Sequence, residues 1–200
     1  MFAEQYIDTV VKKLSTLLDQ FDSINKAAEL IVRTVLGGNR VFVVDKYGII
    51  DNELVERASG LALFNSLKSS RLKLAEDDVL IISAYHPEDE HDQKYLNDAH
   101  SLGAMVIVIS PQGTLAQSAD IALLNNDDGK NGVITASGID RPFCPVSGIM
   151  NATLAWSLAA ESAAKIMANG KIPTVFWGNY LSGGTEKLSE ARKRYATLGY

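Results

Sequence analysis

Apolar residues recur every three or four positions between residues 6 and 21, and charged residues occupy the other faces of this pattern. The spacing predicts one amphipathic helix. Asp22 and Ser23 are candidate N-caps of a second helix, which we expect to end at Leu36 because a glycine pair follows it. Two helices are therefore predicted ahead of the first strand.

Three short apolar runs follow, at residues 41–44, 79–82 and 105–109, and they are continuous rather than alternating. Continuous runs rich in β-branched residues are typical of parallel strands that are buried on both faces. The segments between them, 52–63 and 88–102, are long enough for helices. Strands and helices are thus predicted to alternate along the chain.

A weaker strand at residues 121–124 and a long helix of small residues at 147–168 complete the pattern. We therefore predict a doubly wound α/β fold, with a parallel sheet flanked by helices, in a single domain. Within it we distinguish N-terminal helices at 1–36, an α/β core at 37–170 and a C-terminal extension at 171–200. Polar residues interrupt the long helix, which we interpret as a buried helix rather than a membrane span.

Composition narrows the classes of partner. The 200 residues are 46% apolar, enough to fill the core of one domain, and carry a net charge of −5. An acidic chain without a basic cluster disfavours binding to nucleic acid or to an anionic membrane. The N-terminus does not have the pattern of a secretory signal, and the lone Cys144 has no partner for an intrachain disulfide, so we expect a cytoplasmic protein.

In an open parallel sheet, ligands bind beyond the carboxyl ends of the strands. The loop after the first strand, residues 45–51, lacks the glycine spacing of a dinucleotide site or a P-loop, so we expect no such cofactor. The second loop gathers histidines and acids at residues 86–92. A metal or acid–base site is one interpretation, but we favour acids placed at a helix N-terminus, with Pro87 at the first helical position.

Two further positions have alternative interpretations. Ser147 and Gly148 precede the long helix, where they either present a hydroxyl and N–H groups to a phosphate or simply cap the helix. Cys144 has no evident histidine partner, so we favour a buried small residue over a nucleophile. Trp156 and the alanines of the long helix indicate close packing in a core or a dimer interface.

Several segments, taken in order, resemble the sugar isomerase (SIS) domain proteins of the phosphoheptose isomerase type, and especially an uncharacterised bacterial branch. The similarity covers nearly the whole chain. It is carried by AAEL at 27–30, VFVVDKYGIIDNELVERASGLAL at 41–63, DDVLIIS at 77–83, LGAMVIVIS at 102–110, ADIALLNN at 119–126, PVSGIMNATL at 145–154 and PTVFWGNYLSGGTEK at 173–187.

The resemblance implies a five-stranded parallel sheet, a homodimer or tetramer, and recognition of a sugar phosphate or a related small molecule. In the family, serine-containing loops and helix N-termini hold phosphate, while a Glu or His moves a proton between sugar carbons. Here Tyr47 stands at the serine position of the first loop, and Asp45 stands where a glycine lets the backbone approach phosphate. Only the first serine of the second loop, Ser83, is retained.

Carried over position by position, the resemblance gives a set of candidate site residues. The catalytic candidates are His86 and Glu88. The ligand-binding candidates are Lys46, Tyr47, Gly48, Ser83, Ala84, Tyr85, Ser147 and Gly148.

Three functions are therefore compared. The first is a protein that binds a phosphorylated sugar or sugar derivative, with aldose–ketose isomerase activity if it is an enzyme. The second is a catalytically silent SIS scaffold that acts as a regulatory or protein-interaction module. The third is a metal-dependent hydrolase that uses the cluster at residues 86–92. We expect no cofactor and no bound metal for the first two.

Overall fold

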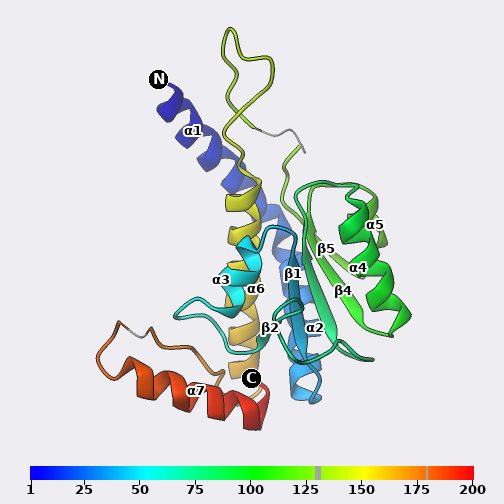
Figure 1. The fold of residues 1–200 in the computed structure, drawn as a ribbon, viewed down its shortest axis with the longest axis vertical. Coiled ribbons are helices and arrows are strands. Elements are labelled where there is room, and N and C mark those ends of the chain that lie inside the picture. The colour runs from blue at the N-terminus through cyan, green and yellow to red at the C-terminus, as the bar shows by residue number, and fades with distance from the viewer. Residues whose placement is uncertain (129–131, 179) are drawn as a thin grey trace.

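Five parallel strands form one sheet in the order β2-β1-β3-β4-β5. The computed structural model describes residues 1–128, 132–178 and 180–200 (Figure 1). The strands are β1 (Val41–Asp45), β2 (Phe64–Ser66), β3 (Val79–Ser83), β4 (Met105–Ser110) and β5 (Ile121–Leu124). The predicted doubly wound α/β fold is confirmed, and the fifth strand, which only the family resemblance implied, is β2.

Helices cover both faces of this sheet (Figure 1). Helices α2 (Phe21–Leu36), α3 (Ile49–Val55) and α6 (Ser147–Ala168) share one buried cluster with one face of the sheet. Helices α4 (Glu90–Ser101) and α5 (Thr114–Ser118) share a second cluster with the opposite face. The arrangement is a three-layer sandwich, and α6 has the bounds that the sequence predicted.

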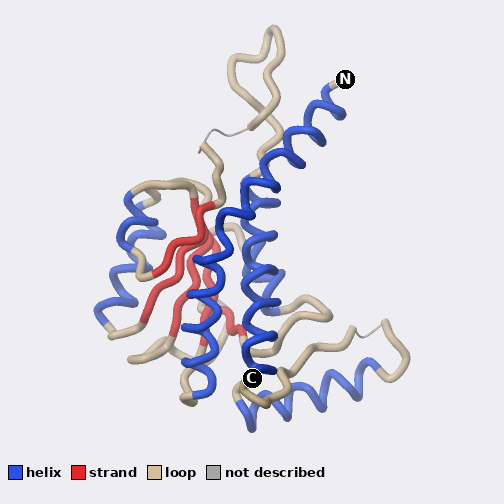
Figure 2. Tube along the Cα trace, turned by 180° about the vertical axis from the view of Figure 1, so that it is seen from behind, coloured by secondary structure: helices blue, strands red, loops and turns tan. Residues whose placement is uncertain are grey.

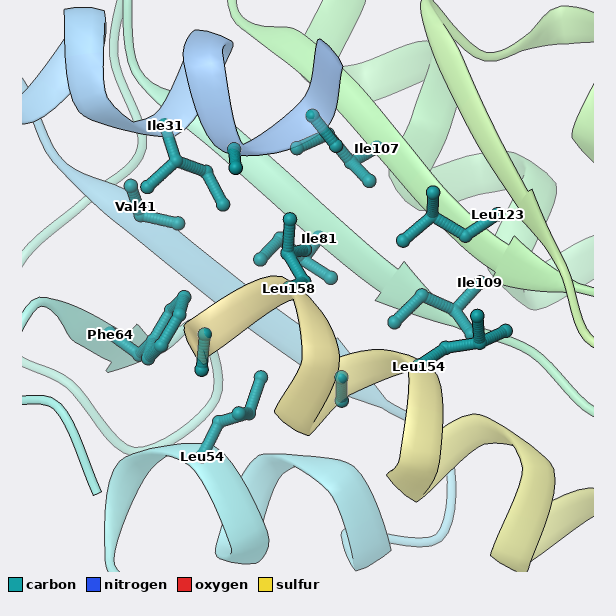
Figure 3. Packing of buried hydrophobic residues seen from close by; sticks show 14 of the residues in the cluster. Ile31, Val41, Leu54, Phe64, Ile81, Ile107, Ile109, Leu123, Leu154 and Leu158 are labelled. Atoms are coloured by element: carbon teal, nitrogen blue, oxygen red, sulfur yellow. The ribbon is translucent and has the colours of Figure 1, made fainter. Parts of the chain in front are cut away.

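The strands are apolar on both faces because each face packs against a helical layer. In β1, Val41 and Val43 point towards α2 and α6, whereas Phe42 and Val44 point towards the α4 layer. Figure 3 shows the first cluster, in which Leu158 of α6 lies among residues of the central strands. Burying each such side chain contributes about 1.5–3 kcal/mol. No helix in the described part of the chain is both long and apolar enough to cross a membrane.

The N-terminal helices differ from the prediction in their boundaries. Helix α1 (Phe2–Ser15) passes through a 3-10 segment, η1 (Thr16–Gln20), directly into α2. The predicted N-caps Asp22 and Ser23 are wrong, because the chain stays helical through this junction and offers no extended residue at which a side chain could cap. Helix α1 projects beyond the sheet together with the loop at 132–146 (Figure 2).

The helix predicted at 52–63 is also shorter than expected. Helix α3 ends at Val55, and the chain then turns through Ser59, whose φ of 70° lies in the left-handed region. Leu61 forms an isolated bridge with Val175 before the chain enters β2. This turn lets the chain reach the edge of the sheet next to β1.

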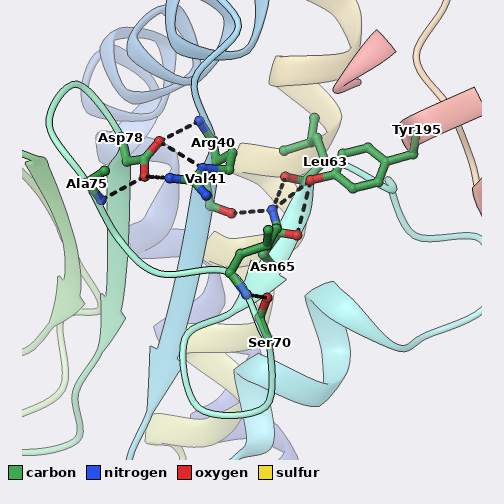
Figure 4. A network of polar contacts seen from close by, with 9 residues as sticks. Arg40, Val41, Leu63, Asn65, Ser70, Ala75, Asp78 and Tyr195 are labelled. Atoms are coloured by element: carbon green, nitrogen blue, oxygen red, sulfur yellow. Dashed lines mark hydrogen bonds and ion pairs between the residues drawn. The ribbon is translucent and has the colours of Figure 1, made fainter. Parts of the chain in front are cut away.

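Helix α7 (Gly184–Leu198) is attached to the sheet through β2 (Figure 4). The side-chain amide of Asn65 donates to the Val41 carbonyl oxygen over 3.1 Å and to the Tyr195 hydroxyl over 2.7 Å. Thr174 donates to the carbonyl oxygen of Tyr200 over 2.7 Å. The Asn65–Tyr195 contact thus fixes the C-terminal extension to the edge strand, and the Thr174 bond joins the two ends of the extension.

A buried ion pair joins the starts of β1 and β3 in the same region (Figure 4). The Asp78 carboxylate accepts bonds from the Arg40 backbone N–H, from the Arg40 guanidinium at 2.8 Å, and from the Ala75 N–H at 2.9 Å. Asp78 is 1% exposed, so water does not replace these donors.

Replacing Asp78 with Ala therefore leaves a guanidinium and two backbone N–H groups without their acceptor. We expect Asp78→Ala to lower the free energy of unfolding by about 2–4 kcal/mol, measured by urea denaturation. The control is Asp8→Ala, which removes the exposed ion pair with Lys12 and is expected to cost less than about 1 kcal/mol. Equal effects of the two variants would contradict this account.

Candidate functional site

A cavity of about 630 Å³ opens at the carboxyl edge of the sheet. Strand order reverses between β1 and β3, which pair so that Asp45 lies opposite Ser83. The loops that follow these two strands diverge to opposite faces, which is where open α/β sheets bind ligands. The lining residues are Tyr47, Ile49, Glu53, Arg57, Tyr85, His86, Asp127, Pro145, Ser147, Gly148, Ile149 and Ala152.

Five of the residues proposed from the sequence meet at this cavity. Tyr47 comes from the first loop, Tyr85 and His86 from the second, and Ser147 and Gly148 from the start of α6. The rings of Tyr47 and Tyr85 make an edge-to-face contact with centroids 5.2 Å apart. The cavity wall therefore combines aromatic surface with polar side chains.

The other five proposed residues do not line the cavity. Ser83 and Ala84 are fully buried. Gly48, with a φ of 75°, makes the turn that begins α3. The Lys46 ammonium lies 2.7 Å from Asp89, and Glu88 is exposed to solvent. Their roles in binding or catalysis stay predictions that the geometry does not support.

Asp45 ends β1 with its carboxyl group turned into the protein. One oxygen accepts from the Tyr47 backbone N–H over 2.9 Å. The other accepts from the Ile50 N–H over 2.7 Å and from the Tyr85 hydroxyl over 2.9 Å. Asp45 is 0% exposed. Burial, followed by the charge of Asp45, raises the pKa of the Tyr85 hydroxyl well above its ordinary value, so this group donates as a neutral phenol.

A second polar network explains why Ser83 is withdrawn from the cavity. The Asn151 amide on α6 donates to the Ser83 hydroxyl over 3.1 Å and to the Ala84 carbonyl oxygen over 3.0 Å. Asn125 in turn donates to the Asn151 side-chain oxygen over 2.7 Å. These buried bonds connect the ends of β3 and β5 to the long helix, so Ser83 has a structural partner.

Three charged residues at the cavity were not predicted from the sequence: Glu53, Arg57 and Asp127. One Glu53 oxygen accepts from Arg57 over 2.6 Å, and the other accepts from the Trp156 indole over 3.0 Å. Asp127 lies 3.6 Å from the Lys13 ammonium. The available signal was the spacing of four residues between Glu53 and Arg57, which would place both side chains on one face of the helix predicted at 52–63.

The acidic second loop caps a helix, although Pro87 is not its first residue. Helix α4 begins at Glu90, and the Asp89 side chain accepts from the backbone N–H groups of His91 and Asp92. The predicted position of Pro87 is therefore wrong, because Asp89 takes the N-cap. The hydrogen bond from Lys46 lowers the pKa of the Asp89 carboxyl group. Acids at the positive end of the helix dipole account for this cluster.

Part of this cluster also has the geometry of a cation site. Asp89, His91 and Asp92 each bring one ligand atom to within 4.8 Å of the others, whereas His86, the other histidine of the loop, lies in the cavity wall. The Lys46 ammonium already supplies a positive charge to Asp89. A metal-dependent hydrolase stays a prediction from the sequence.

The segment before α6 corrects two expectations. Ser147 is the first residue of the helix rather than its cap, and its hydroxyl has no hydrogen-bond partner among the described residues. Cys144 is exposed, not buried as expected, because the loop that carries it projects away from the core. It has a φ of 60°, in the left-handed region.

Asp92 makes stability depend on pH. It is 2% exposed, one of its oxygens has no hydrogen-bond partner, and burial raises its pKa from 3.8 to about 6. The folded protein therefore binds the Asp92 proton more tightly than the unfolded chain does. Binding of this proton contributes its full share to the free energy of unfolding at low pH, and that contribution is lost as pH rises from about 4 to about 6.

Replacing Asp92 with Asn removes that loss. We expect Asp92→Asn to be more stable than the wild type at pH 7.5 by about 1–3 kcal/mol, with the gain shrinking below pH 5 in urea denaturation. Asp98→Asn, an exposed position on the same helix paired with Lys94, is the matched control and should show no such pH-dependent gain. A variant that loses stability at pH 7.5 would show that the charged form is favoured.

Comparisons with known proteins concern the sequence and the fold of the chain. No family model matches the chain. A UPF0309 protein of Brucella anthropi is 25% identical, and the alignment covers 96% of this chain and 95% of the relative. The similarity therefore extends along nearly the whole of both proteins.

Two solved structures share the fold. A phosphoheptose isomerase from Francisella tularensis superimposes with a TM-score of 0.62 at 15% identity, covering 80% of this chain and 95% of the other. A putative phosphosugar isomerase involved in capsule formation, from Bacteroides fragilis, gives 0.60 at 19% identity, covering 84% and 92%. The resemblance to the SIS-domain proteins is therefore confirmed in the fold, and the chain is similar in sequence to UPF0309 proteins.

Proposed function

We propose that this chain binds a sugar derivative in the cavity at the carboxyl edge of the sheet. The observation that carries the proposal is the place of the cavity, at the switch point between β1 and β3 of an SIS-type fold. Its volume of about 630 Å³ lies within the range of small-molecule sites. Solved structures with this fold are described as phosphoheptose and phosphosugar isomerases.

The chemistry of the cavity wall suits a polyhydroxylated ligand. Glu53 offers carboxylate acceptors and Arg57 offers guanidinium donors, while Ser147 presents a hydroxyl that can both donate and accept. The rings of Tyr47 and Tyr85 provide apolar surface for the carbon–hydrogen face of a sugar. Such a combination of a few polar groups with aromatic walls fixes the orientation of a small ligand.

If the protein is an enzyme, we propose aldose–ketose isomerisation. This reaction moves a proton from the hydroxyl-bearing carbon to the adjacent carbonyl carbon, while the hydroxyl oxygen loses a proton and the former carbonyl oxygen gains one, so atoms balance without a redox partner. Glu53 is the carboxylate placed for this role, because its two oxygens are oriented by Arg57 and Trp156. His86, also in the cavity wall, is the second candidate. Glu88 is exposed and lies outside the wall.

A catalytically silent scaffold is the second candidate function. The observation that favours it is the loss of free phosphate-binding groups: Asp45 occupies N–H groups of the first loop, and Asn151 occupies the hydroxyl of Ser83. A regulatory or protein-interaction module would retain the fold without turnover.

Ligand-dependent thermal unfolding tests the sugar-binding proposal. A ligand at a hundred times its dissociation constant adds about 2.7 kcal/mol to the native state, which corresponds to roughly 5–10 °C for a chain of this length. We expect at least one sugar, among fructose, sedoheptulose, glucosamine and their phosphates, to produce a shift of this order. Glu53→Gln should retain part of the shift and abolish any isomerase turnover.

Glu88→Gln is the matched control, since it makes the same chemical change at an exposed position outside the cavity. Binding and turnover should survive in this variant. Turnover that is lost in Glu88→Gln and kept in Glu53→Gln would reverse the assignment. Binding without turnover in the wild type would identify the silent scaffold.

We also propose that two copies of the chain associate through α1. This helix buries no residue, and Ile7 and Val11 on successive turns are 63% and 60% exposed. Leu18 and Phe21, beyond its end, continue the exposed apolar surface at 59% and 62%. Helix α1 also projects from the sheet (Figure 2), so a second copy can pack against it. Exposed apolar surface of this kind is typical of an interface.

Introducing negative charge on this apolar surface tests the assembly. We expect the wild type to have the mass of a dimer or tetramer in light scattering at micromolar concentration, and Ile7→Glu with Val11→Glu to have the mass of a monomer. The control is Lys12→Glu on another face of the same helix, which should leave the mass unchanged. A monomeric wild type would contradict the proposal.

The remaining expectations rest on composition. A net charge of −5 supports a protein without nucleic-acid partners. A cytoplasmic location and a single domain that spans residues 1–200 are likewise proposals.

A further inference from the structure

We propose that Asp45 takes the place of a ligand phosphate in the first loop, so that the cavity selects an unphosphorylated sugar derivative. This inference rests on the proposed sugar-binding function and names the class of ligand. Three steps carry it: the hydrogen bonds of the first loop, the burial of Asp45, and the pairing of Arg57, Lys13 and Lys46 with carboxylates.

The first step concerns the backbone donors of the loop. An anion bound between β1 and α3 would need N–H groups that point towards it. Those of Tyr47 and Ile50 already donate to the Asp45 carboxylate, over 2.9 and 2.7 Å. The carboxylate thus satisfies, from within the chain, donors that would otherwise be free for a ligand oxygen.

The second step concerns whether a ligand could displace this carboxylate. Asp45 is 0% exposed, and the Tyr85 hydroxyl holds it with a third hydrogen bond of 2.9 Å. The Lys68 ammonium also donates to the Asp45 backbone carbonyl oxygen, which fixes the end of β1 from the other side. Displacement would break three bonds to a buried charge, and a phosphate placed beside it would be repelled.

The third step concerns the cations near the cavity. Arg57 is paired with Glu53, and Lys13 with Asp127. Lys46 in the first loop is turned to Asp89, and the Lys68 ammonium, which also reaches this loop, donates to the carbonyl oxygens of Asp45 and Lys46. Arg57, Lys13 and Lys46 therefore each have a carboxylate partner, with which a phosphate dianion would have to compete, and Lys68 is held by two backbone carbonyl oxygens.

What remains in the wall fits neutral hydroxyl groups. Ser147 has a hydroxyl without a protein partner among the described residues, and it lies at the first turn of α6 beside Gly148. The Glu53 carboxylate can accept from sugar hydroxyls while it keeps its bond to Arg57, because each oxygen has more than one lone pair. A sugar without phosphate meets these groups and leaves the first loop intact.

Paired ligands test the selection directly in the wild-type protein. Isothermal titration calorimetry with fructose, sedoheptulose and glucosamine, each compared with its phosphate ester, gives a dissociation constant for both members of a pair. We expect the unphosphorylated member of the bound pair to bind at least about tenfold more tightly. Tighter binding of the phosphate ester would overturn the inference while leaving the proposed function standing.

Removing the carboxylate tests the cause. Asp45→Gly frees the N–H groups of Tyr47 and Ile50 to bind an anion. We therefore expect inorganic phosphate to raise the melting temperature of this variant by several degrees at about 10 mM, the order of concentration that a weak anion site needs. The wild type should show no such shift. Asp51→Asn is the matched control, because it neutralises a neighbouring buried carboxylate that bonds to Ser66 and not to the loop.

If Asp45→Gly fails to fold, Asp45→Ser replaces it in the same experiment. The serine hydroxyl can take the place of only one of the two carboxylate oxygens, so one of the N–H groups of Tyr47 and Ile50 is left free. A phosphate shift in either Asp45 variant, absent from the wild type and from Asp51→Asn, supports the inference. No phosphate shift in a folded Asp45 variant overturns it. If no sugar of either kind binds the wild type, the sugar-binding function fails, and the phosphate result alone still decides the role of Asp45.

Discussion

The carboxyl edge of the sheet is organised around the buried carboxylate of Asp45. It joins the end of β1 to the start of α3 through two backbone N–H groups and to the second loop through Tyr85. Since β1 and β3 are paired neighbours, this single group fixes both loops that diverge at the switch point. The shape of the cavity, the position of its tyrosines and its lack of a free anion cradle in the first loop all follow from that arrangement.

Much of the fold was predictable, because strands that are buried on both faces are continuous runs of apolar, mostly β-branched residues in the sequence. The runs at 41–44, 79–82 and 105–109 all became strands, and the bounds of α6 matched the prediction. Strand β2 was missed because its three residues, Phe64–Ser66, include two polar side chains and resemble a loop. Its Asn65 is polar because it anchors α7, a tertiary role that no local pattern encodes.

The candidate site was predictable only in part. The rule that ligands bind beyond the carboxyl ends of parallel strands drew attention to Tyr85, His86 and Ser147, all of which line the cavity. Glu53 and Arg57 escaped it because Glu53 lies on α3 and Arg57 in the turn that follows this helix, and an ionic pair four residues apart in sequence ordinarily indicates a solvent-exposed helix face. The direction in which a side chain points could not be predicted from the sequence either. Only the three-dimensional structure shows that the Asp45 side chain faces the protein interior and not the cavity.

The most direct test of the account follows individual amide groups by nuclear magnetic resonance. Phosphate is added to the wild-type protein to tens of millimolar while the amide shifts of Tyr47 and Ile50 are recorded. If the Asp45 carboxylate holds these two N–H groups, their shifts stay constant while exposed amides change only weakly and without saturation. A saturable change at Tyr47 and Ile50 would show that phosphate reaches the first loop, and the central claim would be wrong.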